Sequence, residues 1–129
     1  MYQLQLGTTR STPDIQLMAR AINGEARGEP YEGQVAVGAV ILNRVKSSKF
    51  PNTIAGVIYQ SSAFTAVADG QINQPIAENS TVYKAAQDAL NGWDPTGGAL
   101  YYFNPDTATN AWIWSRPYIK TIGKHRFCK

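Results

Sequence analysis

The sequence predicts an α+β fold in which a helical core carries a small antiparallel β-sheet formed mainly by the C-terminal third. Its 129 residues suffice for one domain, because a chain of this size buries roughly two-thirds of its unfolded surface. Helix-like apolar periodicity fills the first part of the chain, and short aromatic segments separated by turn residues follow it. We expect residues 1–11 to be a tail or linker and residues 12–129 to form the single domain.

The first helix is predicted from Thr12 to Arg27. Its start is marked by residues 11–14, Ser-Thr-Pro-Asp, which combine a capping hydroxyl, a proline in the first turn and an acidic residue near the positive helix end. Gly28 and the following Glu29-Pro30 mark its end. Between these signals, apolar residues at helical spacing form one stripe: Ile15, Met18, Ala19, Ile22 and Ala26.

The second helix is predicted over residues 33–45, which are apolar almost all round. Their Val and Ile content would also suit a buried strand, but the length exceeds that of an ordinary strand, about five or six residues. The small residues of this segment would allow another backbone to approach closely. We therefore expect it to be the central, buried helix.

Two further helices are expected before the sheet. Thr53 can cap a short helix over residues 54–59. After a loop rich in Gln, Asn and Pro, Ser80 or Thr81 opens an amphipathic helix that stops at Gly92. The chain then changes character, and three short aromatic or β-branched segments are predicted as strands: 99–103, 112–115, and 118–122 or beyond.

Composition and charge exclude some function classes. The net charge of +3 is mild and the basic clusters are interrupted, so nucleic acid is not implied, whereas an anionic polymer such as a bacterial wall fits equally well. No apolar run reaches membrane-spanning length, and no basic-then-apolar leader begins the sequence. The single cysteine, Cys128, allows no internal disulfide and is expected to be a bystander thiol.

The sequence offers too few suitable residues for several kinds of catalytic site. His125 and Cys128 alone make a weak zinc site, and we expect a strand-end histidine whose nitrogens are hydrogen-bonded. Serine and cysteine triads would both need this one histidine, and glycine-rich phosphate loops are absent. Asp69, Asp94 and Asp106 lie in apparent turns that explain them without catalysis. What remains is glutamate chemistry.

Glu25 is the candidate catalytic carboxylate. It lies seven residues after Met18 and three after Ile22, which places it beside the apolar stripe of the first helix. Partial burial favours the protonated form of a carboxyl group, the form that a general acid needs. Spacing alone leaves open a structural alternative, in which Glu25 pairs with Arg27 or another arginine. Two neighbouring acids, Glu29 and Glu32, are expected to be solvated charges.

Five motifs make the chain resemble a known family. They lie at residues 25–37 (beginning Glu-Ala-Arg-Gly-Glu-Pro), 40–45, 63–70, 100–105 and 122–127. Together, from about residue 13 to the end, they resemble the catalytic domain of the spore cortex-lytic enzymes of Bacillus-type bacteria, in the cell wall hydrolase family. Residues 71–78 depart from the usual pattern. Family members usually carry an export signal and an amino-terminal wall-binding module. Because neither is seen in this sequence, we expect either an isolated catalytic domain or a relative that lacks them.

The resemblance implies a lysozyme-like α+β fold and a peptidoglycan-cleaving lytic transglycosylase that degrades the spore cortex during germination. It implies that Glu25 is catalytic, that no metal or cofactor is required, and that the protein acts outside the cytoplasm, at the spore cortex or cell wall. The implied partner is the peptidoglycan glycan strand, and a regulatory partner protein in the spore is compatible with it. Nucleic acid and a membrane span are not implied.

The implied reaction needs one carboxyl group. Protonated Glu25 would protonate the glycosidic oxygen between N-acetylmuramic acid and N-acetylglucosamine. It would then accept the proton of the muramic C6 hydroxyl as a 1,6-anhydro ring closes. The alternatives are a hydrolytic muramidase, which would recruit a second carboxylate, and a non-catalytic wall-binding module.

Residues for substrate binding are sought among aromatic and amide side chains, since sugars stack on flat rings and hydrogen-bond to amides. Core packing is the alternative for each aromatic residue. The candidates are Phe64, Thr65, Tyr102, Asn104 and Trp114.

Overall fold

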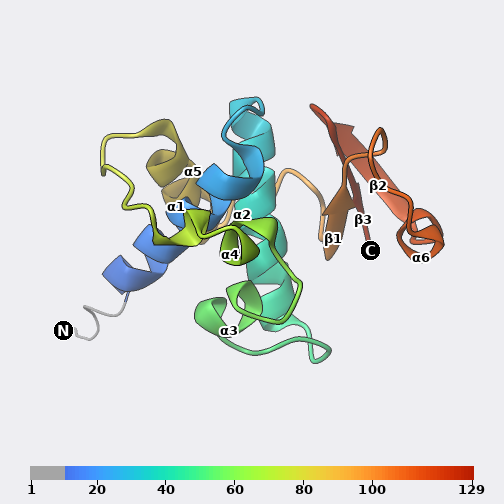
Figure 1. Ribbon diagram of the computed structural model, residues 1–129, viewed down its shortest axis with the longest axis horizontal. Helices are drawn as coiled ribbons and strands as arrows, with labels where there is room; N and C mark the ends of the chain where they lie inside the picture. Colours follow the sequence, from blue (N-terminus) through green and yellow to red (C-terminus); the bar gives the residue numbers. More distant parts are fainter. Residues whose placement is uncertain (1–10) are drawn as a thin grey trace.

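The computed structural model describes residues 11–129, and side chains from residue 14 onward. The predicted α+β class is confirmed: helices gather around α2, and a three-stranded sheet lies on its other side (Figure 1). Nearly all of the expected tail at residues 1–11, and the capping side chains of Ser11 and Thr12, lie outside the described part. The elements are α1 (Ser11–Ala26), α2 (Tyr31–Lys46), α3 (Ile54–Ile58), α4 (Thr65–Ala68), η2 (Gln71–Asn73), α5 (Thr81–Leu90), β1 (Tyr101–Phe103), α6 (Ala111–Trp114), β2 (Tyr118–Ile122) and β3 (His125–Cys128).

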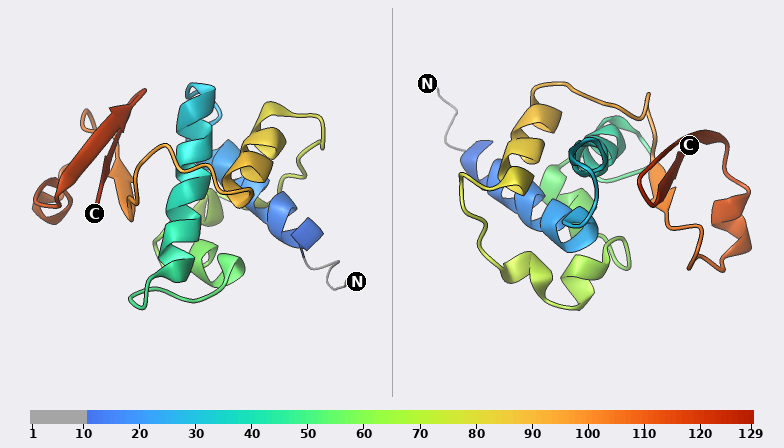
Figure 2. Two further views of the ribbon diagram at one scale, coloured as in Figure 1. Left: turned by 180° about the vertical axis from the view of Figure 1, so that it is seen from behind. Right: turned by 90° about the horizontal axis from the view of Figure 1, so that it is seen from above.

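The central helix is α2, as predicted. It starts at Tyr31, directly after Pro30, and every residue from Gly33 to Ile41 is buried. The packing of α1 and α5 against it, and of the sheet on the opposite side, explains why its sequence is apolar on every face (Figure 2). Gly38 permits this packing, because a Cβ there would lie 2.9 Å from the Cβ of Ala89 on α5.

Local hydrogen bonds confirm two predicted helix starts. The Thr53 hydroxyl accepts a hydrogen bond from the Gly56 N–H (2.9 Å) at α3, and the Ser80 hydroxyl accepts one from the Tyr83 N–H (3.2 Å) at α5. The loop expected over residues 71–79 begins with a single 3₁₀ turn, η2. None of the described helices is both long and apolar enough to cross a membrane.

The sheet has the strand order β1-β3-β2, with both pairs antiparallel. The strand predicted over residues 112–115 is wrong, because this segment is the short helix α6. Asn110 explains the difference: its side-chain oxygen accepts a hydrogen bond from the Trp112 N–H (2.8 Å) and caps the turn. The third strand is β3, whose central residue Phe127 is fully buried.

Candidate active site

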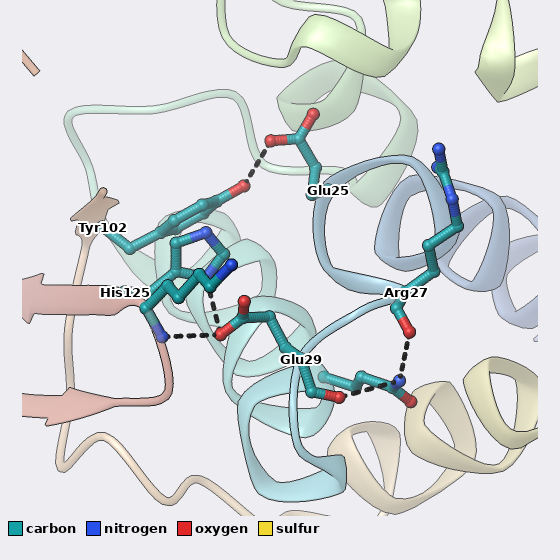
Figure 3. A network of polar contacts seen from close by, with 7 residues as sticks. Glu25, Arg27, Glu29, Tyr102 and His125 are labelled. Atoms are coloured by element: carbon teal, nitrogen blue, oxygen red, sulfur yellow. Dashed lines mark hydrogen bonds and ion pairs between the residues drawn. The ribbon is translucent and has the colours of Figure 1, made fainter. Parts of the chain in front are cut away.

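Glu25 lies in the last turn of α1, where α1, α4 and β1 meet. Its side chain is half-buried, and both carboxylate oxygens accept a hydrogen bond, of which Figure 3 draws the one from Tyr102. The Tyr102 hydroxyl donates to Oε1 (2.8 Å), and the Ala66 N–H donates to Oε2 (3.1 Å). These donors lie 77 and 41 residues from Glu25 along the chain, so the tertiary fold assembles this site.

The donor on α4 depends on a close approach of two helices. Gly24 faces Ala66, and a Cβ on Gly24 would collide with the Ala66 side chain. Because the first N–H groups of a helix have no acceptor within the helix, the Ala66 N–H is free to bind a carboxylate. Gly24 therefore brings a free backbone donor to Glu25.

The donor on β1 is held by the sheet. Tyr102 pairs with Phe127 across the strands, and its ring lies 4.9 Å from the His125 ring and 5.8 Å from the Phe127 ring, centre to centre. Burial, together with the nearby charge of Glu25, raises the pKa of Tyr102 well above its ordinary value. Tyr102 therefore keeps its hydroxyl proton, which it donates to the carboxyl group of Glu25.

No arginine neutralises Glu25 within the described residues. Arg27, the partner considered in the structural alternative, is exposed and donates instead to the Asn23 carbonyl (3.1 Å) and to Oε1 of Gln71 (2.6 Å). Glu25 thus accepts hydrogen bonds from two neutral donors. Among the described residues, no cationic side chain competes with a substrate for its carboxyl group.

Glu29 departs from the expectation of a solvated charge. Its side chain is 11% exposed, and Oε1 accepts the Lys124 N–H (2.9 Å) and lies 4.0 Å from Nδ1 of His125. Glu32 does agree with that expectation, since it is exposed and 3.6 Å from Lys120. Lys124 lies in the β2–β3 turn and His125 begins β3, so the partners of Glu29 are about 95 residues away and no local pattern signals them.

His125 also differs from the prediction. Its side chain is 12% exposed, and Nδ1 has no hydrogen-bond partner among the described residues. In Figure 3 it lies between Tyr102 and Glu29. Burial lowers the pKa of His125, and the charges of Glu29 and Glu25 partly oppose this. The histidine is therefore held as a neutral ring behind Tyr102.

The five predicted binding residues lie in different surroundings. Tyr102 contacts Glu25, and Thr65 is exposed at the start of α4. Phe64 is only 4% exposed and packs in the helical core. Asn104 is half-buried and accepts the Asp106 N–H (2.9 Å) in a turn. Trp114 is exposed on α6 and packs on Phe103, whose side chain points to the opposite face of β1 from Tyr102.

The aspartates in turns behave as predicted where contacts are seen. Asp69 accepts the Gln71 N–H (3.1 Å), and Asp94 accepts the N–H groups of Thr96 (2.8 Å) and Gly98 (3.0 Å). Burial alone would raise the pKa of Asp94, but these hydrogen bonds and others from Thr96 and Asn43 side chains lower it. Within residues 11–129, no group of three or more His, Cys, Asp or Glu side chains is placed to hold a metal ion.

Two features of the site are not predicted from the sequence: the hydrogen bond from the Ala66 N–H and the role of Gly24. A backbone donor has no sequence signature of its own. The available signal for Gly24 is a glycine inside a helical pattern, one residue before a candidate carboxylate, where it lowers helix propensity without any local benefit.

Comparison with known proteins relates this chain to a family. The family model described as Cell Wall Hydrolase matches residues 28–128. The chain is 70% identical over 119 residues to the spore cortex-lytic enzyme of Bacillus cereus, a match covering 92% of this chain and 45% of that protein. It is 32% identical over 124 residues to the cell wall hydrolase CwlJ of Bacillus subtilis, covering 91% and 85% respectively.

Solved structures agree with these matches. The catalytic domain of the Bacillus cereus SleB protein superposes with a TM-score of 0.87 at 65% identity, over 97% of this chain and all of that one. The catalytic domain of the germination-specific lytic transglycosylase SleB from Bacillus anthracis gives 0.88 at 66% identity, over 96% and 100%. The chain spans less than half the length of the curated spore cortex-lytic enzymes that it matches.

Proposed function

The chain belongs to the cell wall hydrolase family, and from that premise we propose that it is a lytic transglycosylase of spore-cortex peptidoglycan. It cleaves the β-1,4 bond between N-acetylmuramic acid and N-acetylglucosamine and leaves 1,6-anhydro-muramic ends during germination. The observation that carries the proposal is the half-buried Glu25, with two neutral donors on its carboxylate. The similarity to spore cortex-lytic enzymes supports the choice of substrate.

We also propose that residues 12–129 are the single catalytic domain. This domain acts on glycan strands outside the cytoplasm, at the spore cortex or cell wall.

In the first step Glu25 is the general acid. The protonated carboxyl gives its proton to the glycosidic oxygen as the bond from that oxygen to C1 of the muramic residue breaks. Positive charge develops at C1, and the N-acetyl group of the same sugar can stabilise it. The carboxylate that results accepts hydrogen bonds from Tyr102 and Ala66, which stabilise the ionised form.

In the second step the same group is the base. The muramic C6 hydroxyl attacks C1 and its proton passes to Glu25, which restores the acid. The proton donated first is thereby replaced, and no water is consumed. One carboxyl group is enough for this cycle, whereas a hydrolase commonly uses a second one, roughly 5 Å or 6.5–9.5 Å away.

The test compares wild type and Glu25→Gln on purified cortex. We expect wild type to release muropeptides with anhydro ends, and the variant to lose activity by roughly 10²–10⁴-fold, the usual contribution of a general acid. Mass spectrometry identifies the products. Fragments heavier by one water, with new reducing ends, would favour a muramidase instead. Unchanged lysis by Glu25→Gln would show that Glu25 is not the acid, and binding without lysis by wild type itself would favour a wall-binding module. Equal activity on vegetative wall would remove the spore-specific part of the proposal.

A further inference from the structure

The positive charge of the chain is concentrated in its C-terminal part. Residues 99–129 contain five Lys or Arg residues against one acidic residue, Asp106, while residues 1–98 contain seven against eight. The segment that forms the sheet and α6 therefore has a net charge of +4, and the rest of the chain has −1. An anionic polymer would be attracted to this side of the molecule.

Exposed aromatic rings lie on the same segment. The rings of Trp112 and Trp114 on α6 meet those of Tyr101 and Phe103 on β1 edge to face, with centres 5.1 and 4.9 Å apart. Figure 1 shows α6 on the side of the sheet away from the helices. Trp112 is 51% and Trp114 is 44% exposed, so this packing leaves about half of each indole in solvent.

Arginines alternate with these rings. The Arg116 guanidinium lies 5.0 Å from the Trp112 ring centre and 5.8 Å from that of Tyr101. The Arg126 guanidinium lies 4.2 Å from the ring of the exposed Tyr118.

Arg116 uses one donor within the chain, since its Nε–H donates to the main-chain oxygen of Lys129 (2.8 Å), and its two terminal nitrogens have no hydrogen-bond partner among the described residues. Neither arginine pairs with an Asp or Glu side chain in this part of the chain, residues 14–129. A guanidinium stacked on an aromatic ring keeps its positive charge. Its N–H donors point outward in the guanidinium plane, where a carboxylate can bind.

Buried contacts connect this surface to the candidate active site. Tyr101 also contacts the guanidinium of the buried Arg44 (5.3 Å), which in turn lies 5.5 Å from the Phe64 ring. Phe64 is the N-cap residue of α4, the helix whose Ala66 N–H binds Glu25. An alternating row of rings and arginines thus leads from α4 to the outside of the sheet.

We infer that the outer end of this row, formed by Trp112 and Arg116, binds the peptidoglycan strand beyond the bond that is cleaved. The indole offers a flat face to a sugar ring, and the guanidinium pairs with a carboxylate of the peptide attached to muramic acid. The charge of this segment is complementary to such a peptide-bearing glycan. The inference rests on the proposed substrate but not on the proposed chemistry.

Binding to insoluble peptidoglycan, freed of teichoic acid, tests this surface without catalysis. All variants are made in the Glu25→Gln background. We expect Trp112→Ala and Arg116→Gln each to weaken binding roughly fivefold to tenfold, as the loss of one stacking or charge-assisted contact. The Arg116→Gln effect should shrink in high salt. Amidation of the peptide carboxylates with carbodiimide should weaken the parent to the level of Arg116→Gln and leave that variant unchanged.

Matched controls come from the helical part. Trp93, 45% exposed, and the exposed Lys84 on α5 offer the same two chemistries away from the row. Trp93→Ala and Lys84→Gln should bind like the parent. Thermal unfolding checks each variant, and if Trp112→Ala is unfolded, an Arg116→Gln/Arg126→Gln pair replaces it. Binding within twofold of the parent, or equal losses in the controls, would overturn the inference. Neither result would affect the product analysis that tests the chemistry.

Discussion

At the scale of single residues, the Tyr102 hydroxyl links the sheet to the carboxylate of Glu25. Burial keeps this phenol neutral, so its hydroxyl is the donor when Glu25 is ionised. When Glu25 carries a proton, one of its oxygens is still an acceptor for Tyr102. Tyr102 is thus suited to hold the carboxyl group in one place through both protonation states.

Tyr102→Phe removes this hydrogen bond and keeps the ring. We expect kcat to fall by roughly tenfold to a hundredfold, because a charge-assisted hydrogen bond contributes roughly 1.5–3 kcal/mol, and KM to change little. Tyr31→Phe is the matched control: its hydroxyl donates to Asp88 (2.6 Å) between α2 and α5, and burial with this bond raises the pKa of Tyr31 to about 12. The control should lose stability and keep kcat. Equal kcat for Tyr102→Phe and wild type would contradict the positioning role.

His125 provides a prediction about pH. Because burial lowers its pKa below the ordinary 6.5, the unfolded chain binds more protons than the folded chain between the lowered pKa and 6.5. The free energy of unfolding therefore falls as pH drops through this window. The charged groups facing the ring are Glu29 and Glu25, which limit the shift.

The measurement is thermal unfolding from about pH 7.5 to about pH 5, the range over which a neutral histidine becomes charged. We expect the midpoint of wild type to fall more steeply with acid than that of His125→Gln, which has no titrating ring. Parallel curves for the two proteins would show that His125 titrates alike in the folded and unfolded chains.

At the scale of elements, the sequence predicts the structure correctly where one local signal decides it. Capping hydroxyls placed α3 and α5, and helical periodicity placed Glu25 beside the core. The prediction is wrong for Glu29, whose side chain is mostly covered because its partners are distant in sequence. It is also wrong for α6, where the local Asn110 cap outweighs the β-propensity of the aromatic residues. Short segments of four residues carry too few positions for periodicity to separate helix from strand.

Two glycines in helices make a paired test of how α4 is placed. Alanine is intrinsically better than glycine in a helix by about 1 kcal/mol, so any loss must come from tertiary crowding. A Cβ on Gly24 would collide with Ala66 of α4, while one on Gly38 would lie 2.9 Å from Ala89 of α5. Gly24→Ala should displace the donor of Glu25, and Gly38→Ala should strain only the core.

We expect Gly24→Ala to lower kcat at least tenfold, consistent with the loss of a placed donor. Gly38→Ala should lower the free energy of unfolding by about 1–3 kcal/mol, the usual effect of overpacking, and keep kcat per folded molecule. Urea unfolding and lysis rates measure the two effects. If Gly24→Ala retains full activity, α4 tolerates the shift and its N–H is not required.

At the scale of the whole molecule, α2 joins two hydrophobic clusters. Val35, Val37 and Ile41 belong to the large helical cluster, whereas Ala36 and Val40 belong to a small cluster with the sheet. Tyr102 packs against both clusters. The two clusters share α2 and Tyr102, the hydrogen-bond partner of Glu25. We therefore expect the sheet and the helices to unfold together.

Phe127→Ala tests this coupling from the sheet side. Phe127 is fully buried, and its truncation should cost about 3–5 kcal/mol. It also removes the ring that packs on Tyr102, so lysis should fall even under conditions where the variant is folded. Circular dichroism follows the helices, and fluorescence is weighted toward Trp112 and Trp114 beside the sheet. Coincident urea curves at a lower midpoint would show one cooperative unit. A fluorescence transition that precedes the loss of helix would instead mean that the sheet unfolds independently of α2, and that Glu25 can lose its tyrosine while the helical core remains intact.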